Sequence, residues 1–151
     1  MANTESLQKL LELAQKQSDE SAKKLGKLSL QHQEAEKKLK LLVDYRETYQ
    51  KQLQDASQNG INHVEWHNFV SFINKLDTAI AEQKLALQYA EHNRKTGNED
   101  YQSCQRKLNT YDTISQRYRR IKVLDQKRRE QKEMDEFASN QFTRKTPGIM
   151  K

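Results

Sequence analysis

The chain has 151 residues, of which 34% are hydrophobic and 32% are charged, against roughly 45–50% and 25% in ordinary globular domains. A thick core of several layers is therefore not expected. One proline and four glycines supply too few turn residues for a β-sandwich or an α/β fold, whereas strong helix formers and glutamine make up more than half of the chain. The composition indicates long helices, with a formal net charge of +6 at neutral pH.

Cysteine content and hydropathy point to a cytoplasmic chain. Cys104 is the single cysteine, so an intramolecular disulfide and a four-thiolate zinc site are both excluded. No apolar run approaches the roughly 18 to 20 residues that span a bilayer, and residues 1–6 lack the basic and apolar regions of a signal peptide. We therefore expect no direct membrane insertion.

A seven-residue repeat begins near the N-terminus. Alternating steps of four and three residues from Leu7 to Ala56 meet Leu, Ala or Tyr at eleven of fifteen positions. This period makes helices supercoil around a partner, with the a and d positions in the shared seam. It predicts a first helix over about residues 4–56.

The segment 57–64 interrupts the repeat, because Asn59-Gly60 tolerates the left-handed conformation that ends a helix. A second seam then runs from Trp66 to Tyr118 and predicts a second helix over about residues 65–145. The predicted fold is all-α, with two long helices in an antiparallel coiled-coil hairpin and the second helix longer than the first. Residues 1–145 would form this single hairpin, and residues 146–151 a disordered tail.

The pairing of side-chain volumes predicts the register of the hairpin. A turn near Ile61 makes the numbers of facing residues sum to about 122, and small residues then face large ones along much of the seam. Leu25 faces Gly97, for example, and Ala14 faces Leu108. Since Leu7 would face about Ser115, the second helix should project by about 25 residues beyond the start of the first.

The projecting part is strongly basic. Residues 117–132 contain eight basic and two acidic residues, a net of +6, while the remainder of the chain is neutral. A basic helix that continues from a coiled coil is the layout of leucine-zipper DNA readers. Ile121 and Leu124 recur among the cations and have no partner in the hairpin, which favours docking on an acidic protein over nucleic acid or a plain solvated face.

No group of residues predicts catalysis, a metal or a cofactor. His63 and His67 have the four-residue spacing of a shared metal site, but no third ligand is nearby, and solvated histidines at the turn are the favoured interpretation. Cys104 occupies a d position, where it serves as a small packing residue. We expect a protein that is not an enzyme, with no catalytic residues.

One flank of the seam carries residues that the heptad does not assign to the core. The g positions place Tyr45 on the first helix, with Phe72, Ala79 and Ala86 on the second, along the same side of an antiparallel coil. A two-stranded seam buries only its a and d rows. Tyr45 and Phe72, with the edges of Leu42, Tyr49 and Leu76, should therefore expose an apolar strip of roughly a few hundred Å², which predicts a partner site.

The chain resembles the FliJ family of flagellar protein-export components. The residues that carry the resemblance are Leu41-Leu42-Val43-Asp44-Tyr45, Tyr49, Asn59-Gly60-Ile61, Trp66, Phe72-Ile73, Leu76, Ile80 and Met134-Asp135-Glu136-Phe137-Ala138. The resemblance implies a bacterial cytoplasmic protein, peripheral on the inner membrane through the export apparatus. It further implies a stalk-like coiled coil that enters the export ATPase hexamer and promotes its assembly and activity. The same resemblance implies contacts with the cytoplasmic domain of the membrane export gate and with export chaperones.

The resemblance also implies where these partners bind. The gate-binding strip maps onto Leu42, Tyr45, Tyr49, Phe72, Leu76 and Ala79, which agrees with the flank defined by the heptad. At the two ends of the strip the family pattern has a glutamine and a histidine, whereas this chain has Lys38 and Gln83. For the ATPase, the expected contacts are Arg120, Ile121, Leu124, Arg128 and Arg129. The alternatives are an export chaperone or adaptor that does not act on the ATPase, and a basic coiled coil that binds nucleic acid.

Overall fold

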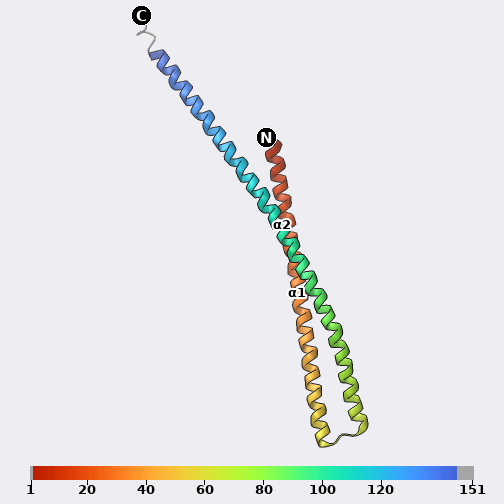
Figure 1. Ribbon diagram of the computed structural model, residues 1–151. Coiled ribbons are helices and arrows are strands. Elements are labelled where there is room, and N and C mark those ends of the chain that lie inside the picture. The colour runs from red at the N-terminus through yellow and green to blue at the C-terminus, as the bar shows by residue number, and fades with distance from the viewer. Residues whose placement is uncertain (1, 146–151) are drawn as a thin grey trace. The chain divides into compact units, whose positions relative to one another are not determined.

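The computed structural model describes residues 2–145, with side chains from 4 to 144, and consists of two helices. Helix α1 spans Ala2–Asn59 and helix α2 spans His63–Lys145. They run in opposite directions from a short connection (Figure 1), and the described residues contain no strand. The predicted all-α hairpin with a longer second helix is confirmed. The predicted tail at 146–151 lies outside the described residues.

The turn is shorter than the predicted segment 57–64, because only residues 60–62 lie outside the helices. Gly60 has φ +80°, a conformation that glycine adopts at little cost and that ends a helix. Helix α1 therefore continues through the polar residues before Gly60 and ends at Asn59. The Asn62 side chain then accepts a hydrogen bond from the Glu65 backbone N–H at 2.8 Å, which is the N-cap geometry that starts a helix. Helix α2 therefore begins earlier than predicted.

The contacts of the chain cluster in two compact units. One unit is Gln17–Gln105, which includes the turn, and the other joins the residues up to Lys16 with those from Arg106 onward. The assignment of residues 1–145 to a single domain stays a prediction.

Within Gln17–Gln105, the cross-helix contacts confirm the register. A Cβ built on Gly97 would lie 3.6 Å from Leu25 Cδ1 and 2.7 Å from Leu28 Cδ1, so the predicted pair of Leu25 and Gly97 is in contact. Three polar contacts also join the helices: Gln105 to Ser18, Gln83 to the Ala35 carbonyl, and Arg46 to Asp77. The residue numbers of these four pairs sum to between 118 and 123, close to the predicted 122.

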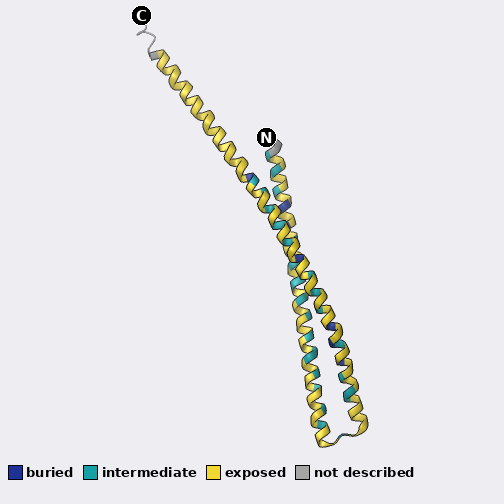
Figure 2. Cartoon of the chain, viewed as in Figure 1, coloured by how far each residue is buried: buried dark blue, intermediate teal, exposed yellow. Residues whose placement is uncertain are grey.

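The core of this unit is thin, as the composition predicts. Leu76 and Ile80 are its buried apolar side chains, and Ser18 and Gln83 are buried polar ones. Ser18 accepts a hydrogen bond from Gln105 Nε2 at 2.7 Å, which satisfies the buried hydroxyl. Figure 2 shows how sparse the buried positions are along both helices.

Three residues that the heptad places in the seam, Trp66, Arg94 and Tyr118, are exposed, which corrects the sequence prediction. Tyr118 lies beyond Ser115, the last buried residue in the described part of α2. Trp66 is 42% exposed, because it lies one turn into α2 and stacks on His63 at a ring separation of 6.2 Å. Arg94 is also exposed, and Asn93 is half-buried in its place. A long cationic side chain gains hydration by leaving a seam, so the smaller amide occupies the space.

In the other unit, Ser115 is the last buried residue of α2 among those that the structure describes. Ala14 and Ser115 are buried, and Leu7 lines one groove with Ser115, as the predicted register requires. From residue 116 to 144 every described side chain is exposed (Figure 2). The predicted projection of α2 is confirmed. Among the described residues, neither helix has a stretch apolar and long enough to cross a bilayer.

Candidate partner-binding surfaces

The apolar strip, defined as Leu42, Tyr45 and Tyr49 on α1 with Phe72, Leu76 and Ala79 on α2, is only partly buried. Tyr45 is 51% exposed and Phe72 is 40% exposed, which confirms that these two side chains lie outside the core. Leu42, Tyr49 and Ala79 are half-buried. Leu76 is buried, so it supports the strip from beneath and offers little surface of its own.

The aromatic rings of the strip join the two helices. The Tyr49 and Phe72 ring centroids are 4.4 Å apart with a tilt of 42°, and Tyr49 meets Phe69 edge-on at 6.4 Å and 61°. Offset and edge-to-face arrangements at these separations are favourable. The strip is therefore one surface built by both helices.

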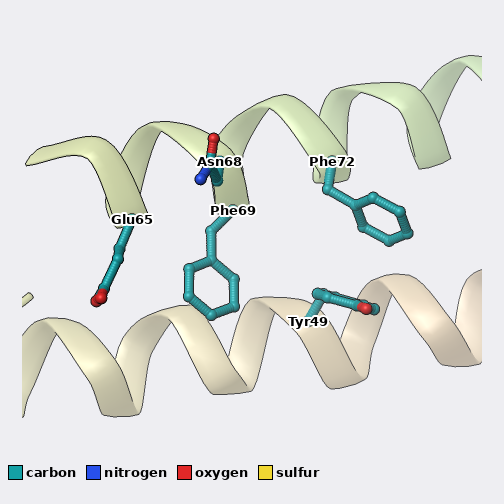
Figure 3. Close-up of a pocket in the computed structure, with 5 residues that line it drawn as sticks. All are labelled: Tyr49, Glu65, Asn68, Phe69 and Phe72. Atoms are coloured by element: carbon teal, nitrogen blue, oxygen red, sulfur yellow. The ribbon is translucent and has the colours of Figure 1, made fainter.

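A cavity of about 320 Å³ opens where the strip approaches the turn, and Figure 3 shows its lining. Tyr49 rises from α1, while Glu65, Phe69 and Phe72 extend from α2, with Asn68 at the edge. Sequence reasoning missed Glu65, Asn68 and Phe69 as parts of this surface. Their spacing could have indicated them, because Asn68 and Glu65 each precede a strip-side phenylalanine by four residues, which is one helical turn.

A polar contact closes the opposite flank at the same level. Arg46 donates a short hydrogen bond from Nε to Asp77 Oδ1 and a second bond from Nη1 to Gln50 Oε1 at 2.8 Å. The hydrogen bond to Asp77 and the attraction of its carboxylate raise the pKa of Arg46 above its ordinary value. Arg46, which occupies an a position of the heptad, thus forms an ion pair with Asp77 across the two helices.

The two residues that depart from the family pattern have different surroundings. Lys38 is exposed and could contact a partner. Gln83 is buried, and its Nε2 donates to the Ala35 carbonyl oxygen at 3.1 Å. The Gln83 amide is therefore committed to the hairpin and does not form part of a polar rim around the strip.

The basic segment, defined as residues 117–132, presents every side chain to solvent. Ile121 is 56% exposed and Leu124 is 54% exposed, and Arg120, Arg128 and Arg129 lie among them. No ion pair within the described chain engages these cations. Val123, which sequence reasoning missed, is also exposed and lines a shallow groove whose other walls are Arg119, Arg120 and Leu124.

The residues considered for metal binding do not assemble a metal site. The His63 and His67 rings stack with centroids 6.1 Å apart and an interplanar angle of 20°. Residues 4–144 hold no group of three His, Cys, Asp or Glu side chains placed to share an ion. Cys104 is half-buried in the seam.

The fold and the surfaces together define an α-helical coiled-coil hairpin protein that exposes an apolar strip and a basic segment. The profile of the family described as "Flagellar FliJ protein" matches residues 3–147. The chain is 32% identical to the Flagellar FliJ protein of Salmonella typhi over 145 residues, which cover 96% of this chain and 99% of the relative. It is 30% identical to the Flagellar FliJ protein of Escherichia coli strain K12, with the same coverage. The chain belongs to the FliJ family.

Proposed function

We propose that this flagellar export component is a non-enzymatic, stalk-like coiled coil that enters the export ATPase hexamer and couples it to the export gate. The proposal rests on one observation, which is that the chain exposes two unlike surfaces. The apolar strip lies within Gln17–Gln105, and the basic segment belongs to the other unit. Each surface suits a different partner.

The apolar strip is the proposed contact for the cytoplasmic domain of the gate. Tyr45 and Phe72 leave large aromatic surface in water, which is the composition found at the centre of protein interfaces. The adjoining cavity between Tyr49, Phe69 and Phe72 would accept one apolar side chain from the partner. The gate domain would thereby fasten the chain at the inner membrane from the cytoplasmic side.

The basic segment is the proposed contact for the ATPase. Arg120, Arg128 and Arg129 would steer an acidic surface toward the helix, because long-range attraction speeds encounter. Ile121 and Leu124 would then supply apolar contact. A nucleic acid would use the cations but would leave these apolar side chains in water, so their exposure favours a protein partner.

The proposed coupling depends on α2, which continues without a break from His63 to Lys145. A continuous hydrogen-bonded helix without proline resists sharp bending. The proposed coupling would need this helix to carry a displacement from a partner at the strip to a partner at the basic segment. Binding of export chaperones would add substrate delivery to the same component.

The test is to mix the purified protein with the export ATPase and measure ring assembly by electron microscopy and the rate of ATP hydrolysis. The proposal expects more rings and faster hydrolysis. Unchanged assembly and hydrolysis would contradict it. Binding to chaperones without any effect on the ATPase would then favour an export adaptor, and salt-sensitive binding to random DNA would favour a nucleic-acid-binding coil.

A further inference from the structure

Arg46 is the one cation at a seam position between the turn and the middle of α1. Its guanidinium is held from two sides, by Asp77 across the hairpin and by Gln50 one turn along α1. The Arg46 side chain is 36% exposed and that of Asp77 is 47% exposed. Exposed ion pairs add little net stability, so a gain in stability is a weak account of this contact.

The position of the pair in the register gives a better account. If the helices slipped by one heptad, Arg46 would face Val70 or Lys84 in place of Asp77. The first would leave the guanidinium beside an apolar side chain, and the second would oppose two cations. Asp77 would face Leu39 or Leu53 in the same two registers. Of the three registers, only the observed one pairs opposite charges, which is how polar seam residues select register in coiled coils.

The pair stands level with the apolar strip but on the other flank. Arg46 follows Tyr45 directly, and Asp77 follows Leu76 directly. Any slip or separation of the helices at this level would move Tyr45 and Tyr49 away from Phe72. The ring contact of 4.4 Å between Tyr49 and Phe72 leaves no room for such movement without loss of the joined surface.

We propose that Arg46 and Asp77 are positioning residues that hold the two halves of the apolar strip in register for the partner. The hydrogen bond between Arg46 and Asp77 fixes the helices from the flank that the partner does not cover. For gate binding this inference rests on the proposed function, whereas the register itself can be measured without any partner.

The experiment uses the full-length chain with Cys104→Ser and two spin labels, at Gln54→Cys on α1 and Glu82→Cys on α2. Both positions are exposed and are offset along the helix axes, so a one-heptad slip would change their separation by about 10 Å at 1.5 Å per residue. The label distance and the affinity for the purified gate domain are compared in Arg46→Asp, Asp77→Arg and the variant that carries both changes. Lys51→Asp makes the same charge change as Arg46→Asp at an exposed site on α1 and serves as the control.

Each single reversal is expected to shift or broaden the label distance and to weaken gate binding at least about threefold. The double variant is expected to recover both, and Lys51→Asp to change neither. If a reversed variant fails to fold by circular dichroism, Arg46→Gln and Asp77→Asn replace it with the same expectations. Distances that stay narrow and unchanged in the single variants, or a double variant no better than the singles, would overturn the proposal. If the unaltered chain does not bind the gate domain, the proposed function fails, and the label distances alone decide the role of the pair.

Discussion

The apolar strip and the basic segment differ in how the chain makes them and in the force each offers a partner. The strip needs two helices, and the stretch from residue 44 to 79 that contains most of it has five acidic and three basic residues, a net of −2. The residues of the basic segment all belong to α2 and carry a net of +6 over 16 residues. A hairpin with a thin core can therefore present two unlike surfaces, one suited to apolar contact and the other to attraction between charges.

The largest expected effect comes from reversing charge in the basic segment. Arg128→Glu with Arg129→Glu lowers its net charge from +6 to +2, which should reduce stimulation of the export ATPase at least about tenfold by weakening steering and contact. ATP hydrolysis at fixed ATPase concentration measures this. The matched control is Lys23→Glu with Lys24→Glu, which changes the net charge of the chain by the same amount at exposed sites on α1. Equal stimulation by both double variants would exclude the basic segment as the contact for the ATPase.

Removing one exposed aromatic ring from the strip should have the next largest effect. Phe72→Ala removes the ring that packs on Tyr49, and gate-domain affinity should fall about tenfold, as for aromatic interface residues generally. Helicity should be unchanged, because Phe72 lies at the edge of the core. Leu85→Ala, at a more exposed α2 site outside the strip, is the control in isothermal titration. Unchanged affinity in Phe72→Ala would exclude the strip as the gate contact.

Salt should separate the two surfaces without any mutation. Raising NaCl from about 50 mM to about 300 mM shortens the distance over which exposed charges attract or repel each other. Binding to the ATPase should weaken several-fold, while binding to the gate domain should change less than about twofold. Surface plasmon resonance at both salt concentrations measures the two responses. Equal salt sensitivity would show that the surfaces do not differ in the force that they use.

The smallest effect is expected from the turn. Asn62→Ala removes the side-chain cap on the Glu65 N–H and should lower the free energy of unfolding in urea by about 1 kcal/mol. Because the strip adjoins the turn, gate affinity should fall slightly while ATPase stimulation stays the same. Asn98→Ala, at an exposed position inside α2, should not destabilise the chain. A cap variant as stable as the original would contradict the assigned role of Asn62.

The fold and its register could be predicted from the sequence because one period governs most of the chain. The heptad places Leu25 opposite Gly97, and only a small residue can occupy that site without moving Leu28. The exposure of Tyr45 and Phe72 followed from the same period, since g positions lie outside a two-stranded seam. These predictions required only helical geometry and side-chain volume.

The features that escaped prediction depend on where long side chains reach. The heptad assigns Trp66 and Arg94 to the seam, but it does not say that an indole near a helix end or a guanidinium will turn outward. It likewise gives no sign that Gln83 bonds the Ala35 carbonyl or that Arg46 crosses to Asp77. Glu65, Asn68 and Phe69 line a cavity because they lie within about one turn of α2. The heptad assigns residues to the seam, but it does not identify which residues line a cavity beside it.

In the proposed function, the strip and the basic segment bind different partners at the same time. Size-exclusion chromatography with light scattering, on the full chain mixed with the gate domain and the export ATPase, tests it most directly. We expect one complex that contains all three proteins, from which Phe72→Ala releases only the gate domain and the Arg128→Glu, Arg129→Glu variant releases only the ATPase. Mutual displacement of the gate domain and the ATPase from the chain would contradict it.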